Sequence, residues 1–137
     1  MKLSKVILCS ILTLILTLAS TGCSLHFIKQ RLAPPHSVGD GILFQYDAPS
    51  ARRVNLAGNF PDNQWLKDGI QHFVMHDDGM NGDRIAGDGI WSIITTIPKG
   101  RYEYKFLVDR NSWLTDPNAI EYVDDGMGGK NSVLIVK

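Results

Sequence analysis

Four aspartates lie close together in residues 76–91, and their side chains could bind a cation. The segment reads HDDGMNGDRIAGDGIW and contains Asp77, Asp78, Asp83 and Asp88 among glycines. Calcium prefers six to eight oxygen ligands on flexible loops, which these carboxylates and Asn81 could supply. Their spacing, however, is not that of an EF-hand loop. We favour a glycine-rich hairpin whose aspartates accept hydrogen bonds from their own backbone, and we predict no metal site.

The remaining reactive side chains do not predict an enzyme. His72 and His76 are four residues apart, and on a β-strand this separates them by about 13 Å, too far for two ligands of one zinc ion. We therefore expect both to be exposed strand residues. The two cysteines of the chain fall in or next to an export signal, and no serine lies in a G-x-S-x-G context. The sequence predicts no catalytic residues and no cofactor.

Residues 101–117, RYEYKFLVDRNSWLTDP, combine a lysine and a tryptophan that could bind a ligand. Side chains alternate across a strand, so the aromatic residues that begin with Tyr102 face the core. The same alternation places Glu103 and Lys105 on the outer face. Trp113 follows just past a turn, beside Lys105. The pattern predicts a flat aromatic side chain and an ammonium group on one exposed surface.

The elements that must position these residues are short strands. Apolar residues alternate with polar ones in segments around residues 42–46, 54–56, 73–75, 91–97, 102–108 and 132–136, and glycine, proline, asparagine and aspartate cluster between the segments. No stretch has a sustained helical period with capping residues. The spacing of the strands and turns predicts an all-β, two-sheet sandwich.

The first 22 residues have the features of a signal peptide. A basic start is followed by a largely apolar run over residues 6–19, which is shorter than the roughly 20 residues of a membrane-spanning helix. Ser20, Thr21 and Gly22 then precede Cys23 and resemble the lipobox of bacterial lipoproteins, although Ser20 stands where that family usually has leucine. The resemblance implies cleavage before Cys23 and acylation of this cysteine. The alternative is an ordinary cleaved signal.

This reading divides the chain into three parts: a signal peptide at 1–22, a lipidated tether at 23–39 that contains Pro34–Pro35, and a domain at 40–137. Acidic and basic residues number 14 each in the whole chain. Removal of Lys2 and Lys5 with the signal leaves a formal charge of −2. This near-neutral balance does not predict a nucleic-acid partner. The lipoprotein resemblance implies a membrane partner, a cell-envelope location and, with Ser24 after the cysteine in a Gram-negative cell, the outer membrane.

Three segments of the domain resemble the glycogen-binding modules of carbohydrate-binding family 48. They are VNLAGNF with a following tryptophan, YEYKFLVD with WLTDP, and the C-terminal KNSVLIVK. Relatives include the β subunits of AMP-activated protein kinase and the isoamylase-type early-set domains. The resemblance covers roughly residues 40–137 and implies an immunoglobulin-like early-set β-sandwich.

The resemblance also implies four carbohydrate-binding residues: Trp65, Lys105, Trp113 and Asn131. An aromatic ring offers an apolar face to the C–H side of a sugar, while amide and ammonium groups bind hydroxyls at its edge. The segment before Trp65 has two residues more than usual, and Met127 stands where the kinase modules have leucine. The implied function is non-catalytic binding of an α-glucan or related oligosaccharide. The alternative is an envelope protein-interaction or structural module that has the fold without the sugar site.

Overall fold

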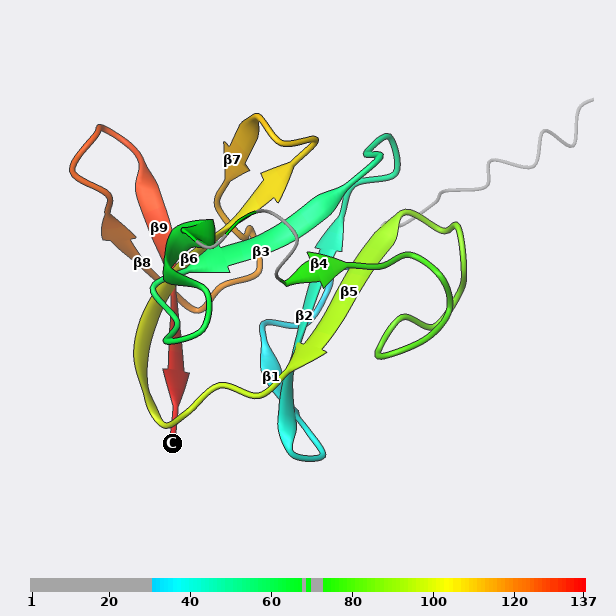
Figure 1. Ribbon diagram of the computed structural model, residues 1–137, viewed down its shortest axis with the longest axis horizontal. Helices are drawn as coiled ribbons and strands as arrows, with labels where there is room; N and C mark the ends of the chain where they lie inside the picture. Colours follow the sequence, from blue (N-terminus) through cyan, green and yellow to red (C-terminus); the bar gives the residue numbers. More distant parts are fainter. Residues whose placement is uncertain (1–30, 68, 70–72) are drawn as a thin grey trace, which may run out of the picture. The chain divides into compact units, whose positions relative to one another are not determined.

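The computed structural model describes residues 31–67, 69 and 73–137, so the predicted signal peptide, Cys23 and His72 lie outside the described residues. Within these described ranges, nine strands and one short 3-10 helix follow one another (Figure 1). They are β1 (His36–Val38), β2 (Gly41–Asp47), β3 (Val54–Gly58), η2 (Gln64–Leu66), β4 (Val74–Met75), β5 (Ile90–Thr95), β6 (Gly100–Val108), β7 (Ser112–Leu114), β8 (Glu121–Asp124) and β9 (Lys130–Val136). Among the described residues, no helix is long and apolar enough to cross a membrane.

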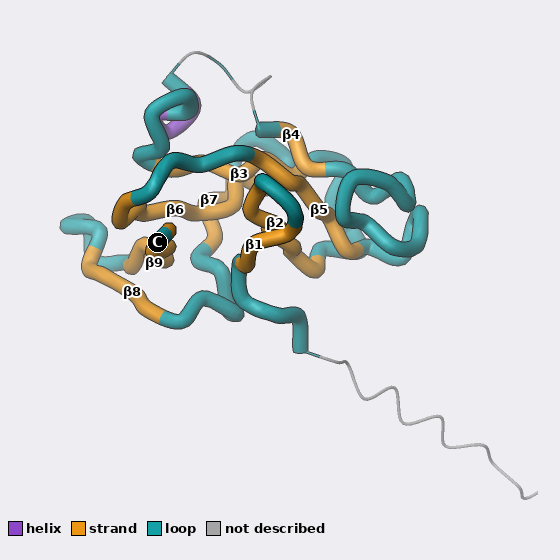
Figure 2. The backbone as a smooth tube through the Cα atoms, turned by 90° about the horizontal axis from the view of Figure 1, so that it is seen from below, coloured by secondary structure: helices purple, strands orange, loops and turns teal. Residues whose placement is uncertain are grey.

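The strands form two antiparallel sheets, which confirms the predicted all-β sandwich. One sheet has the order β1-β2-β5, and the other has the order β4-β3-β6-β9-β8, with β7 paired to β6 (Figure 2). Strand β6 is the centre of the larger sheet. Its first half pairs with β9, and its second half pairs with β3 on one side and β7 on the other.

The core lies between the sheets and follows the predicted alternation. Phe44 from β2 makes an edge-to-face contact with Tyr104 from β6, with ring centroids 5.3 Å apart. Leu56, Phe106 and Leu134 are buried in the same cluster. Glu103 and Lys105, on either side of Tyr104 in β6, therefore point to the opposite face of the larger sheet. This outer face carries the candidate site.

The chain joins the sandwich earlier than residue 40, the boundary predicted from the sequence. Strand β1 pairs with β2 in the register His36 to Leu43. Before it, Nη2 of Arg31 donates a hydrogen bond to the carbonyl oxygen of Pro117 at 2.9 Å. The sequence predicts a tether as far as residue 39, because this segment has no regular spacing of apolar residues and contains Pro34–Pro35. The two prolines directly precede β1, so they do not interrupt its pairing with β2. The compact unit spans Arg31–Lys137.

Candidate functional site

The four residues predicted to bind a ligand line one groove on the outer face of the larger sheet. Trp65 comes from η2, Lys105 from β6, Trp113 from β7 and Asn131 from β9. The groove has a volume of about 500 Å³, and its lining also includes Glu103, Asp125 and Met127. The structure therefore brings together side chains that are up to 66 positions apart in the sequence.

The pairing of β6 with its neighbours places Lys105 and Trp113 on the same face. Leu107 lies opposite Trp113, and Lys105 lies opposite Ala57 of β3. Because Lys105 and Leu107 are two residues apart on one strand, both point outward. Trp113 remains 46% exposed. It is the most accessible of the four predicted side chains and offers an apolar surface to solvent.

Trp65 lies on a turn with an unusual backbone. Gln64, Trp65 and Leu66 all have positive φ angles, of 43°, 59° and 65°, a region that side chains other than glycine occupy at a cost. The turn nevertheless directs Trp65 to the groove. Its ring centroid lies 6.4 Å from that of Trp113, and the two planes are inclined by 56°. The two extra residues in this segment do not remove Trp65 from the groove.

Asn63 anchors this turn and was not recognised from the sequence. Its buried side chain accepts a hydrogen bond from the backbone N–H of Gly58 at 2.8 Å. It also donates one to the carbonyl oxygen of Leu56 at 3.1 Å. Trp65 packs against a small cluster of Ala57, Leu66 and Leu107. Trp65 therefore lines the groove and also packs against this cluster.

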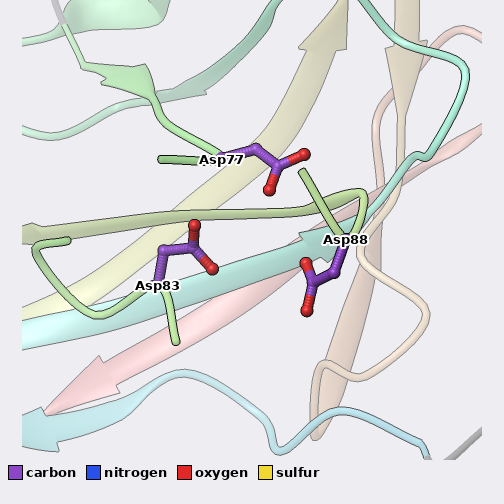
Figure 3. A group of neighbouring side chains, drawn as sticks. All are labelled: Asp77, Asp83 and Asp88. Atoms are coloured by element: carbon purple, nitrogen blue, oxygen red, sulfur yellow. The ribbon is translucent and has the colours of Figure 1, made fainter. Parts of the chain in front are cut away.

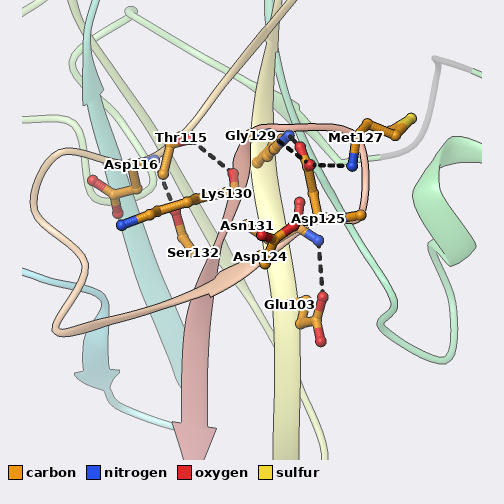
Figure 4. Close-up of polar contacts among 12 residues, drawn as sticks. Glu103, Thr115, Asp116, Asp124, Asp125, Met127, Gly129, Lys130, Asn131 and Ser132 are labelled. Carbon is orange, nitrogen blue, oxygen red and sulfur yellow. Dashed lines mark hydrogen bonds and ion pairs between the residues drawn. The ribbon is translucent and has the colours of Figure 1, made fainter.

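Lys105 forms an ion pair with Asp125 across the groove. The distance from Nζ to Oδ2 is 2.7 Å, and both side chains are largely buried. The other oxygen of Asp125 accepts the backbone N–H groups of Met127 and Gly129, both at 2.9 Å (Figure 4). Asp125 thus fixes both the β8–β9 loop and the direction of the lysine. Met127, on the same loop, is 87% exposed.

Asn131 lies at the floor of the groove and is only 9% exposed. Its Nδ2 donates a hydrogen bond to Oε2 of Glu103 at 2.8 Å. One amide hydrogen of Asn131 is therefore used within the protein. The groove contains two carboxylates and one ammonium group, so it does not attract anions, and its polar groups suit a neutral ligand with hydroxyls.

The hydrogen bonds from Lys105, Met127 and Gly129 lower the pKa of Asp125 from 3.8 to about 2. Because the folded-state pKa lies below the ordinary value, Asp125 contributes stability above pH 3.8 and loses it as the pH falls towards about 2. We expect the Asp125 carboxyl to titrate near pH 2 in a carbon-13 NMR experiment. The Asp125→Asn variant should lack this part of the pH dependence of unfolding. An unchanged acid profile in that variant would contradict the assignment.

Asp116 and Pro117, which end the WLTDP segment, do not line the groove. The buried carboxylate of Asp116 accepts the backbone N–H of Asn118 at 2.8 Å, which is a local turn interaction. Its second oxygen accepts the Tyr104 hydroxyl at 2.7 Å. Asp116 therefore supports the core side of β6, opposite the groove.

Three of the four aspartates of the loop between β4 and β5 converge (Figure 3). Carboxylate oxygens of Asp77, Asp83 and Asp88 lie within 4.8 Å of one another. Each also accepts backbone N–H groups of its own loop: Asp77 from Gly87 at 2.8 Å, and Asp83 from Gly79 at 2.6 Å. Asp88 accepts the N–H of Ile90 at 2.9 Å. These bonds match the hairpin-loop interpretation.

We expect the protein not to require calcium, because the loop aspartates already organise the backbone through these hydrogen bonds. Millimolar calcium should change the thermal midpoint no more than millimolar magnesium does. The Asp83→Asn variant provides the control for a carboxylate-specific effect. A rise of several degrees with calcium alone, lost in Asp83→Asn, would contradict this expectation and identify the converging Asp77, Asp83 and Asp88 as ligands.

His76 lies at the start of this loop, forms a bridge with Ser92 through its backbone, and is exposed.

No protein-family model matches the chain, and no curated protein matches it significantly.

Proposed function

We propose that the groove binds a neutral α-glucan of the glycogen or starch type and that the protein is a non-catalytic binding module. One observation carries this proposal: Trp65, Lys105, Trp113 and Asn131, which a resemblance in sequence suggested, all line one groove. The two indole rings form an angled apolar surface. A curved chain of glucose units could stack the apolar faces of its sugar rings on such a surface.

The polar groups of the groove fit hydroxyls better than charges. The ammonium group of Lys105 has three N–H donors, and Asp125 accepts one of them. The remaining donors can bind sugar hydroxyls, while Glu103 and Asp125 can accept hydrogen bonds from others. An anionic sugar would meet two carboxylates. The proposed ligand is therefore uncharged.

Native gel electrophoresis with glycogen in the matrix tests this proposal. An open groove buries little ligand surface, and sugars lose hydration on binding, so we expect a dissociation constant on the order of micromolar to millimolar, or about −8 to −4 kcal/mol. Glycogen and amylose should retard the protein, and β-cyclodextrin should compete. Added sodium chloride should change the retardation little, because the ligand is uncharged.

The alternative is a protein-interaction module of the cell envelope. Exposed Met127 and Trp113 at the groove favour it, since methionine and tryptophan are enriched in protein interfaces. Native gel electrophoresis with glycogen also distinguishes the two functions. A protein that no glucan retards and no cyclodextrin affects would have a groove built for packing or for a protein partner.

We further propose that acyl chains on Cys23 attach the domain to a membrane of the cell envelope, the outer membrane in a Gram-negative cell. Several chains give a stable anchor because each buried methylene contributes about 0.8 kcal/mol. Cys23→Ser should abolish incorporation of labelled fatty acid and release the protein from membranes or leave an uncleaved precursor. Cys9→Ser is the matched control and should behave like the native chain. Normal labelling of Cys23→Ser would disprove the anchor.

A further inference from the structure

A second groove, of about 870 Å³, shares none of its described lining residues with the first. It lies between the loop that precedes β3, strands β4 and β5, and the tip of the β6–β7 hairpin. Arg52, Arg53 and Arg110 line it, together with His76, and Asp109 is its only carboxylate among the described lining residues. Three arginines at one opening are notable in a domain whose formal charge is −2 from residue 23 onward.

Asp109 brings these arginines together through the backbone. Its Oδ1 accepts the N–H groups of Arg52 at 2.8 Å and Arg53 at 3.0 Å. Its own N–H donates to the carbonyl oxygen of Arg53 at 2.9 Å. The hairpin tip is thereby attached to the loop before β3. Oδ1 of Asp109 therefore binds two backbone N–H groups of this loop.

The hairpin tip positions Arg110 at the groove in an unfavourable backbone conformation. Asp109 and Arg110 are the central residues of a turn in which the N–H of Asn111 donates to the carbonyl oxygen of Val108. Their φ angles of 49° and 67° are usually adopted by asparagine and glycine in such a turn. Within the described part of the chain, the guanidinium groups of Arg52 and Arg110 form no ion pair. The Nε of Arg53 donates to Oδ1 of Asn55 at 3.0 Å.

Trp91 forms a fixed wall of the same groove. Its Nε1 donates a hydrogen bond to the carbonyl oxygen of Ala48 at 3.1 Å, and the indole is partly buried against the core. We propose that this groove binds a phosphoryl group. Guanidinium groups match the oxygens of phosphate with paired N–H donors, and the indole offers an apolar surface to the group that carries the phosphate.

The three tryptophans allow a direct test, because two line the first groove and Trp91 lines the second. Inorganic phosphate is titrated into the nitrogen-15-labelled full chain at constant ionic strength, with chloride as the reference anion. Phosphate should shift the Trp91 indole signal and leave those of Trp65 and Trp113 in place. The Arg52→Gln/Arg110→Gln variant should bind phosphate at least about tenfold more weakly, with an unchanged thermal midpoint. Arg84→Gln, an exposed arginine outside the groove, is the matched control.

Two further arms identify the source of the phosphoryl group. A soluble phosphate ester that shifts Trp91 more than inorganic phosphate does indicates a soluble ligand. Retention on phosphatidylglycerol vesicles, absent on phosphatidylcholine vesicles and reduced in the double variant but not in Arg84→Gln, indicates a lipid headgroup. The proposal is overturned if phosphate leaves Trp91 unchanged, if chloride shifts it equally, or if the double variant binds phosphate like the native chain.

Discussion

Trp113→Ala is expected to abolish detectable retardation of the protein by glycogen. The side chain is 46% exposed and offers the most accessible aromatic surface of the groove. Loss of this surface should cost roughly 1.5–3 kcal/mol of binding free energy, which for a weak ligand removes a measurable interaction. Lys105→Ala should cost less binding free energy, on the order of 1 kcal/mol, because it removes one hydrogen bond to the sugar and leaves the aromatic surface in place.

The thermal midpoint separates a binding role from a packing role for Trp113. Because the ring points outward from β7, its loss should leave the domain folded, with a change in midpoint close to that of a control. Ile120→Ala is a suitable control, since Ile120 is exposed and does not line the groove. Trp113 would be a packing residue under two conditions. Glycogen would not retard the native protein, and the thermal midpoint would fall sharply in Trp113→Ala but not in Ile120→Ala.

The sequence was sufficient to predict the site residues on β6 because strand alternation is a local property. Tyr104 and Phe106 enter the core, and Lys105 between them faces the groove. The same reasoning placed Glu103 on the outer face. It could not show that Glu103 binds Asn131, because that contact depends on the pairing of β6 with β9.

Other parts of the site depend on contacts that no local pattern encodes. Asp125 lies in a run that reads as a turn, yet it forms the ion pair with Lys105, 20 positions away. The left-handed turn at Trp65 has no glycine to signal it, and the buried side chain of Asn63 stabilises it. Strand β1 was missed because three exposed residues next to two prolines have no apolar alternation. In each case tertiary contacts override the local preference.

The buried network around Asp116 provides the largest expected effect on stability. Tyr104 of β6, Ser132 of β9 and Tyr122 of β8 are neighbours in register. Tyr104 donates its hydroxyl to the carboxylate of Asp116, the N–H of Asp116 donates to Oγ of Ser132, and the Tyr122 hydroxyl donates to the carbonyl oxygen of Asp116. Asp116 is 1% exposed. One residue thus connects three strands of the larger sheet.

Asp116→Ala should lower the free energy of unfolding by about 3 kcal/mol. It leaves the hydroxyl of Tyr104 and the N–H of Asn118 buried without their acceptor, and each such group costs about 1–3 kcal/mol. Burial also raises the pKa of the hydroxyl of Tyr104, so this group remains a donor at neutral pH. Denaturant titration measures the effect. Asp62→Ala, which changes an exposed aspartate, is the control, and equal midpoints for the two variants would contradict the role of the network.

The pH dependence of unfolding gives an independent check on Asp116. Burial raises its pKa above 3.8, against hydrogen bonds from Tyr104 and Asn118 that lower it. The folded state therefore binds the proton more tightly than the unfolded state, and this carboxyl adds stability as the pH falls from neutral through its raised pKa to 3.8. Asp116→Asn, which cannot take up this proton, should lack the gain. As the pH falls through this range, the free energy of unfolding of the native protein should rise relative to that of Asp116→Asn. A constant difference between the two free energies would show that burial does not shift the pKa of Asp116.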